Sequence, residues 1–440
     1  MSTKIALTPR PPLPTVGEGE KRACSPLPRQ GEGLGVRAPR RRLLLQSGAA
    51  LALSAVLGRT GTGAAAPLAC GVPPREPHPF AQPDLSAHWA ATPALSKTAI
   101  TRTGDAYRYE VDGRFQTIRG MGYNPPELYA SHADRRARLE RDLGLMAVAG
   151  VNTLIGWNPA TIDGLALDVA QQVGLGVALP FDVDFTLDVT DTGVRQAFSG
   201  AVLAWVERYR SHPAVRMWAV GNEVLQRSIP PAWCGTAPSA SQSAWADAWS
   251  SLLVEVADLI RARDPDHPVL YREAEDSYAP WLARALAANP ADRPWLVYGV
   301  NAYTPRLAEI LDGWPERGIP TSLLVSEYAP LNAPHGERAD RFREIWGIIK
   351  AHARFVLGGA VYVWSTDGPE EVDRAFGLVD AGGTPVDDAL DTISTLYHAE
   401  DRGGWTLRNG SLDHDVQTVG SGVSAASGVR SGPDGDRRDG

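Results

Sequence analysis

Short apolar runs alternate with longer amphipathic stretches in a regular order along residues 106–398. Eight runs have the length, the β-branched content and the Gly or polar boundaries of buried strands. In chain order they read FQTIRGMGY, VNTLIGW, GVALPFDV, VRMWAVGN, PVLYREA, WLVYGVNAY, TSLLVSEY and GGAVYVWS. Between them, apolar residues at three- and four-residue spacing predict helices such as 133–150, 195–210, 242–263 and 337–354, with a final helix near Asp387 to Glu400.

This alternation of strands and helices indicates a parallel sheet, because parallel neighbours need a crossover connection. Eight units in just under three hundred residues fit a closed (β/α)8 TIM barrel of the α/β class better than an open doubly wound sheet. No GxGxxG follows the first strand, which disfavours a dinucleotide-binding fold. A hairpin, YRYEVDGRFQTIRG, with its turn at Asp112-Gly113, leads into the first strand and is expected to close the barrel floor.

Segments on both sides of the barrel have different compositions. Residues 1–66 are interpreted as a leader and residues 67–105 as an N-terminal linker or extension. From 399 to 440 the chain drifts into GSGVSAASGVRSGPDGDRRDG, which has too few apolar residues to order itself, so a disordered tail is expected. The barrel is therefore predicted to be the one catalytic domain.

The leader carries an export pattern between about residues 36 and 66. Residues 40–58, RRRLLLQSGAALALSAVLG, have a basic start and an apolar stretch too short to span a bilayer, followed by small residues suited to cleavage near Ala66. The arginines resemble a twin-arginine signal, in which Arg40 and Arg41 would take the paired positions. We therefore expect export to a periplasmic or extracellular location. A lipid anchor at Cys70, in PLAC, is disfavoured because Pro67 is a poor match.

Charge and composition limit the kinds of partner and cofactor that the sequence predicts. The leader holds ten Lys/Arg and three Asp/Glu, a net +7, so the remaining 33 Lys/Arg and 48 Asp/Glu give the body −15. An acidic body argues against nucleic acid and against a membrane partner beyond the export signal. Three scattered cysteines, Cys24, Cys70 and Cys234, make no disulfide framework, and nine histidines without HxH or HExxH spacing predict neither a metal nor a cofactor.

Two carboxylates occupy equivalent places in the repeat. Glu223 follows the fourth strand in AVGNEV, and Glu327 ends the seventh in LLVSEY. They are 104 residues apart, about 35 per unit over three units, which is the normal length of a strand plus a helix. Because side chains from the carboxyl ends of barrel strands converge over the packed interior, we expect these two glutamates to face each other.

A facing pair of carboxyl groups suits the cleavage of a glycosidic bond. One carboxyl group protonates the leaving oxygen, and the other stabilises or attacks the oxocarbenium-like centre. Glu223 would have to hold a proton near neutral pH, while Glu327 stays ionised, with about 5–5.5 Å between them for double displacement. Hydrogen bonds to Glu327 are expected to keep its pKa low.

VGNEV followed by SEY resembles the 4/7 superfamily of retaining glycoside hydrolases (clan A), over essentially all of residues 106–398. The resemblance implies that Glu223 is the general acid/base and that Glu327 is the nucleophile. It also implies that Asn222 contacts the sugar 2-hydroxyl.

Further substrate contacts follow from the same resemblance. Tyr303, in YGVNAY, matches the position whose hydroxyl touches the nucleophile, although a packing tyrosine is the alternative. Trp364, at the end of the eighth strand, matches a sugar platform, with a core tryptophan as the alternative. Tyr123 and Asn124, after the first strand, could line the same subsite.

The motifs do not assign the chain to one family within the superfamily. IRGMGYNP, HPAVRMWAVGNEV and FGLVDAGGTP resemble family 2 and family 5 glycosidase barrels, whereas GNEV, YGVNAY and SEY together resemble β-1,3-glucanosyltransferases. Many relatives carry an arginine on strand two and a histidine after strand three. Here VNTLIGWN and VALPFDVDF contain neither, and Asp182 and Asp184 stand near the end of strand three instead.

The sequence thus predicts an exported retaining glycoside hydrolase that acts on a β-linked oligo- or polysaccharide by double displacement. One alternative is a β-glucanosyltransferase using the same site, in which a sugar hydroxyl replaces water. Another is a non-catalytic carbohydrate-binding barrel, which would keep the aromatic residues but lose one carboxylate. Sugar identity, linkage and oligomeric state stay open.

Overall fold

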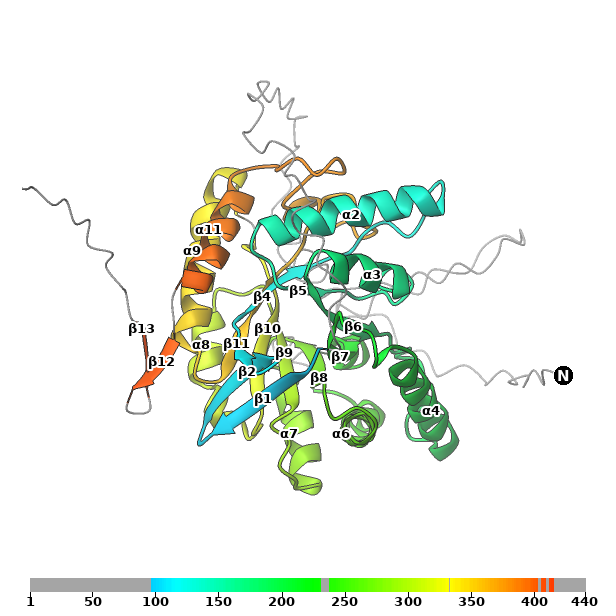
Figure 1. Cartoon of the computed structure of the whole chain (residues 1–440). Coiled ribbons are helices and arrows are strands. Elements are labelled where there is room, and N and C mark those ends of the chain that lie inside the picture. Colours follow the sequence, from blue (N-terminus) through cyan, green and yellow to red (C-terminus); the bar gives the residue numbers. More distant parts are fainter. Residues whose placement is uncertain (1–95, 231–236, 332, 403–404, 409–410, 415–440) are drawn as a thin grey trace, which may run out of the picture.

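The computed structural model describes residues 96–230, 237–331, 333–402, 405–408 and 411–414 (Figure 1). The expected export signal, the disfavoured lipid anchor at Cys70 and all three cysteines lie outside the described residues.

Eight parallel strands close into a barrel, in which each strand pairs with its neighbours in chain order and the last pairs with the first. Each of the eight apolar runs contributes one strand, so the predicted TIM barrel is confirmed. The barrel strands are β4 (Ile118–Gly122), β5 (Thr153–Ile155), β6 (Gly176–Phe181), β7 (Val215–Asn222), β8 (Val269–Ala274), β9 (Leu296–Ala302), β10 (Ser322–Tyr328) and β11 (Val356–Val361).

Helices surround the barrel (Figure 1). Their bounds are α2 (His132–Val148), α3 (Gly164–Gln172), α4 (Thr192–Tyr209), α5 (Val224–Ser228), α6 (Ala240–Arg263), α7 (Ala279–Ala288), α8 (Leu307–Asp312), α9 (Arg338–Ala351), α10 (Asp373–Phe376) and α11 (Ala389–Arg402), with short 3₁₀ helices η3 (Trp314–Arg317) and η4 (His335–Glu337). Several begin at side-chain caps: Asp163 accepts hydrogen bonds from backbone N–H groups of α3, and Ser239 and Gln242 form a capping box at α6. These caps fix where each helix begins after a strand.

A three-stranded antiparallel sheet covers the amino-terminal end of the barrel. It consists of β1 (Thr98–Thr103), β2 (Ala106–Val111) and β3 (Arg114–Phe115). The predicted turn is present, with positive φ at Asp112 and Gly113. Buried residues of this sheet pack in one cluster with inward residues of all eight barrel strands, so the sheet closes the floor as expected. The structure differs from the sequence prediction in one respect, because β1 lies inside the segment interpreted as a linker.

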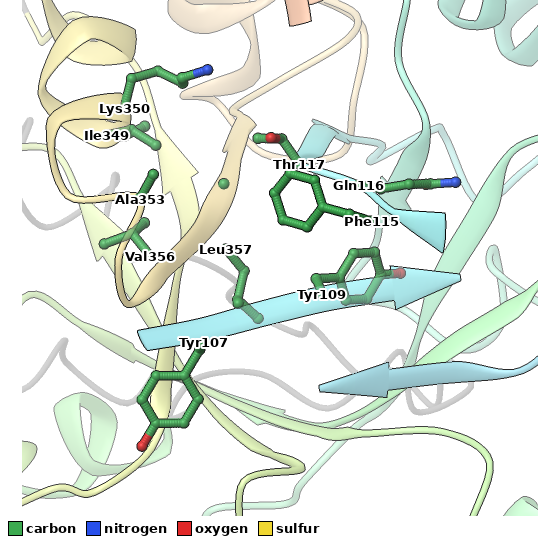
Figure 2. A pocket seen from close by; sticks show the side chains of 11 residues that line it. Tyr107, Tyr109, Phe115, Gln116, Thr117, Ile349, Lys350, Ala353, Val356 and Leu357 are labelled. Atoms are coloured by element: carbon green, nitrogen blue, oxygen red, sulfur yellow. The ribbon is translucent and has the colours of Figure 1, made fainter. Parts of the chain in front are cut away.

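A small, mostly apolar hollow lies between this sheet and the start of β11 (Figure 2). Tyr107, Tyr109 and Phe115 line it from β2 and β3, and Ile349 and Lys350 line it from α9. Because β11 begins here, this hollow lies at the opposite end of the barrel from the two glutamates.

The carboxyl-terminal prediction is wrong for part of the expected tail. Helix α11 continues to Arg402, and β12 (Trp405–Arg408) pairs antiparallel with β13 (Ser411–His414). The sequence WTLRNGSLDH carries the signal that was overlooked, since apolar residues flank an Asn-Gly dipeptide that favours a hairpin turn.

We predict that Tyr109→Ala destabilises the fold through the floor of the barrel. Tyr109 is 1% exposed within the interior cluster, so truncation leaves a cavity and lowers the free energy of unfolding by about 3–5 kcal/mol. Urea denaturation measures this. Glu110→Ala, at the neighbouring solvent-facing position, is the control and is expected to change stability by less than about 0.5 kcal/mol. Equal, small effects of both substitutions would show that the sheet does not seal the barrel.

Candidate active site

The two predicted carboxylates lie at the carboxyl end of the barrel. Glu223 directly follows β7, the fourth barrel strand, and Glu327 lies near the end of β10, the seventh. Each residue is only 1% exposed. The closure of the barrel therefore brings two acidic side chains from distant parts of the chain to its same end and buries both.

Asn301 connects the two glutamates. On β9 it is the Cα partner of Glu327, and its Nδ2 donates a 2.9 Å hydrogen bond to Oε1 of Glu223. Its Oδ1 accepts a 2.8 Å hydrogen bond from the Ser326 hydroxyl, which fixes the orientation of the amide. Asn301 Nδ2 also lies 3.2 Å from Oδ1 of Asn222, so the amide predicted to contact sugar belongs to the same cluster.

Backbone geometry directs Glu223 into this cluster. Glu223 has a φ of 51°, in the left-handed region that non-glycine residues seldom adopt, and Gly221 has a φ of 73°. Such strain costs on the order of 1–3 kcal/mol and persists only where neighbours hold it. Here β8 holds it: Glu223 N donates to the Arg272 carbonyl at 3.0 Å, and the buried Glu273 accepts from Leu225 N at 2.7 Å.

Two donors orient the carboxylate of Glu327. The indole Nε1 of Trp157, just beyond β5, donates to Oε1 at 2.6 Å, and the Tyr303 hydroxyl donates to Oε2 at 2.7 Å. The predicted contact between Tyr303 and Glu327 is therefore present. Sequence reasoning missed Trp157, although it ends the second strand run in the same way as Glu327 ends the seventh.

The electrostatic environment of Glu327 differs from the prediction of a low pKa. Burial, followed by the negative charge of Glu223, raises the pKa of Glu327 to about 8, and Arg272, Tyr303 and Trp157 only partly oppose this. Desolvation of a fully buried carboxylate outweighs its hydrogen bonds. The repulsion applies only while Glu223 is charged, so the two carboxyl groups do not titrate independently of each other.

Arg272 supplies the positive charge beside this pair. It points from β8 into the barrel, is 1% exposed, and its guanidinium carbon lies 6.0 Å from the ring centroid of Trp157. Its Cα partner on β9 is Gly299, where a Cβ atom would lie 2.8 Å from Arg272 Cγ. Burial lowers the pKa of Arg272 to about 10, which leaves it charged at neutral pH. The chain lacks an arginine on β5, the second barrel strand, but it has Arg272 near the glutamates on β8, the fifth barrel strand.

Two aromatic predictions are not supported. Trp364 is completely buried in the core between the barrel and its helices, and the Tyr123 hydroxyl donates to Asp142 Oδ2 on α2 at 3.0 Å. Successive side chains of a strand point to opposite faces, and both of these face the helices. The aromatic residue that faces the site from the end of β11 is Tyr362, whose ring centroid lies 5.1 Å from Trp157 and 5.8 Å from Tyr303.

Asn124 holds a loop instead of facing the glutamates. Its Nδ2 donates a 3.0 Å hydrogen bond to Asp373 Oδ2, and the same carboxyl group accepts from the Tyr362 hydroxyl at 2.7 Å. Asn124 is 3% exposed and Asp373 is fully buried. Asn124 therefore positions Tyr362 through Asp373.

Asp184 and Asp182 take different roles after β6. Asp184 accepts hydrogen bonds from the backbone and hydroxyl of Thr186, which form a local turn, whereas Asp182 lines a hollow beside Asn222.

Among the residues that the structure describes, no group of three or more His, Cys, Asp or Glu side chains is arranged to hold a metal ion. No helix in the same residues is both long and apolar enough to cross a membrane.

No protein-family model matches this chain. Among curated proteins, β-mannosidase A of Aspergillus clavatus is 24% identical over 128 residues, which are 29% of this chain and 14% of that protein. β-Mannosidase A of Aspergillus niger is 23% identical over 128 residues, again covering 29% and 14%. The chain thus matches only a small part of the length of these relatives.

Among solved structures, a Bacteroides uniformis β-glucuronidase aligns with a TM-score of 0.54 and 15% identity, over 68% of this chain and 37% of that chain. Bacteroides uniformis β-glucuronidase 2, covalently bound to cyclophellitol-6-carboxylate aziridine, aligns with a TM-score of 0.53 and 15% identity, over 68% and 37%. At this identity the similarity shows the barrel fold.

We predict that Glu327→Gln gains stability relative to the wild type as the pH rises. The pKa of Glu327 is about 8 in the folded protein, against about 4.3 in an unfolded chain. In the wild type, Glu327 contributes fully to the free energy of unfolding at pH values below its pKa in the unfolded chain. This contribution is lost as the pH rises through the pKa in the folded protein, because the unfolded chain releases a proton that the folded one retains. Glutamine removes this dependence while it can still accept from Trp157.

The measurement is urea denaturation of both proteins at pH 5 and pH 8.5. The stability of the variant minus that of the wild type should increase by more than about 1.4 kcal/mol between these values, which corresponds to one pKa unit. Glu344→Gln, at an exposed position on α9, is the control and should give a nearly constant difference. A constant difference for Glu327→Gln as well would contradict the raised pKa.

Proposed function

We propose that this protein is a retaining glycoside hydrolase that cleaves an O-glycosidic bond of a β-linked glycan. The observation that carries the proposal is the pair of buried glutamates at the barrel mouth, where Asn301 donates a hydrogen bond to Glu223 and is the strand partner of Glu327. Glycoside cleavage by double displacement requires one carboxyl group as a proton donor and one as an anionic nucleophile.

In the proposed first step, a carboxylate oxygen of Glu327 attacks the anomeric carbon while Glu223 gives its proton to the departing glycosidic oxygen. A glycosyl ester on Glu327 forms and the bond to the aglycone breaks. In the second step, Glu223 as carboxylate takes a proton from water, the resulting oxygen attacks the anomeric carbon, and Glu327 is released. Two inversions retain the anomeric configuration.

The surrounding groups fit these roles. Trp157 and Tyr303 hold the two oxygens of Glu327, which restricts the rotation of the attacking carboxylate. The positive charge of Arg272 favours the ionised form of Glu327, which is the form that a nucleophile needs. Asn222, held by Asn301, is proposed to contact the sugar 2-hydroxyl.

The comparisons support the reaction class and a β linkage. The curated relatives are named β-mannosidases, and the structural neighbours with the same barrel are named β-glucuronidases. Together with the sequence resemblance to the 4/7 superfamily, these names favour hydrolysis of a β-glycoside. A binding barrel without catalysis would not need two carboxylates held in this way.

Transfer to a sugar hydroxyl in place of water would use the same glycosyl ester. Analysis of the products at increasing acceptor concentration separates hydrolysis from a β-glucanosyltransferase activity.

We also propose that the protein is exported to a periplasmic or extracellular location, on the signal pattern of residues 36–66.

We predict that Glu223→Gln and Glu327→Gln each lower kcat on aryl β-glycosides by about 10²–10⁴, because each removes one half of the acid and nucleophile pair. Glu327→Gly in the presence of azide should regain turnover and give an α-configured glycosyl azide, since one displacement then replaces two. Proton NMR identifies this product. Glu309→Gln, at an exposed carboxylate on α8, is the control. Full activity of either active-site glutamine variant would exclude the mechanism.

We predict that Arg272→Met moves the pH profile of kcat/KM to higher pH. The Arg272 charge favours the ionised form of Glu327 and opposes its raised pKa. Without it, Glu327 binds its proton more tightly, and the acid limb should rise by about one unit or more. Arg306→Met, on the same side of the barrel but exposed and paired with Glu309, should leave the profile in place. An unshifted profile in Arg272→Met would show that this arginine does not set the ionisation of the pair.

A further inference from the structure

A hollow opens beside the two glutamates at the ends of β5, β6, β7 and β8. Trp157, Phe181, Asp182, Gly221, Asn222, Arg227 and Arg272 line it. Trp157 is the residue that donates to Glu327, and Asn222 directly precedes Glu223. A ligand group in this hollow would therefore lie next to the proposed reaction centre.

Two side chains that line this space carry buried hydrogen-bond donors. Arg272 Nε and Nη1 and Asn222 Nδ2 are buried, and none of them has a hydrogen-bond partner among the residues that the structure describes. An unmet buried donor costs about 1–3 kcal/mol, and more when the donor is charged. Asn222 Nδ2 can serve the sugar 2-hydroxyl, and the two donors of Arg272 then indicate a place for a second acceptor.

The charge of the lining agrees with an acidic occupant. The lining includes two arginines, Arg227 and Arg272, and one aspartate, Asp182, in a chain whose formal net charge is −8. Arg227 comes from α5, and its guanidinium carbon lies 5.9 Å from the ring centroid of Phe185. Like-charged arginines repel each other, so an anion between them would be stabilised by both.

The donor chemistry favours an anion over a neutral sugar hydroxyl. Guanidinium groups donate hydrogen bonds and accept none, whereas a hydroxyl group is best satisfied by both kinds of partner. Carboxylate and sulfate oxygens accept several hydrogen bonds each and pair with arginine in charge-assisted geometry.

We propose that this hollow is a subsite for an anionic group carried by the glycan, either a uronic acid carboxylate or a sulfate ester. The proposal rests on the proposed glycosidase function for its substrate, but binding of an anion by these residues does not require turnover. Trp157 and Phe181 supply apolar walls beside the charged group. Arg227 is then a specificity-determining residue, and Arg272 serves both the anion and Glu327.

The test compares substrates that differ only in the anionic group. All substrates are 4-nitrophenyl glycosides. Two pairs test a carboxylate: β-D-glucuronide with β-D-glucoside, and β-D-galacturonide with β-D-galactoside. The 6-sulfated β-D-glucoside, compared with the same β-D-glucoside, tests a sulfate ester instead. The wild type should favour one anionic member by at least tenfold in kcat/KM. Arg227→Gln should lower this preference by at least tenfold, and Arg227→Lys, which keeps the charge, should restore part of it. Arg306→Gln removes an exposed charge outside the hollow and should leave the preference unchanged.

A second readout separates this proposal from the proposed function. Calorimetry with Glu327→Gln measures the binding of D-glucuronate, D-glucose 6-sulfate and D-glucose without turnover. Binding of one anionic sugar at least tenfold tighter than glucose, lost in the double variant with Arg227→Gln, supports the subsite even if no aryl glycoside is cleaved. If neutral glycosides are cleaved with no preference for an anionic substrate, the subsite proposal is overturned while the glycosidase function stands. The same holds if a preference for an anionic substrate exists but Arg227→Gln leaves it intact. No tighter binding of either anionic sugar overturns it as well.

Discussion

The burial of two carboxyl groups side by side at one end of the barrel is the constraint on which the rest of the site depends. Glu223 and Glu327 are both almost fully buried, so ionisation of Glu327 is opposed first by the loss of water around it and then by the charge of Glu223. Asn301 and Arg272 lie beside both groups, and the strained backbone of Glu223 is held by the adjacent strand β8. At the opposite end, the β1–β3 sheet packs against inward residues of the barrel strands and closes the floor.

The sequence was sufficient for the fold and for the two glutamates because both follow from periodicity. Strand and helix lengths repeat, and a residue that ends an apolar run in a barrel must lie at the carboxyl face. Side-chain direction could not be obtained in the same way. Trp364 and Tyr123 are at the right ends of the right strands, but they point to the helices, because one residue of difference along a strand changes the face.

The remaining site residues were missed for a different reason. Arg272 lies in the middle of a strand run, where an apolar residue is expected, and the glycine at 299 on the next strand leaves room for it. Asn301 and Trp157 gain their importance from hydrogen bonds to side chains 78 and 170 residues away. The raised pKa of Glu327 likewise comes mainly from burial, which no local sequence pattern reports.

Trapping the glycosyl ester tests the central claim most directly. A 2-deoxy-2-fluoro β-glycosyl fluoride slows the second step more than the first, so the ester accumulates and survives proteolysis for peptide mass mapping. Our account predicts one added glycosyl unit, on the peptide that contains Glu327, and no label in Glu327→Gln. A label on Glu223, or turnover of a natural glycoside with inversion of the anomeric configuration and no labelled protein, would contradict it.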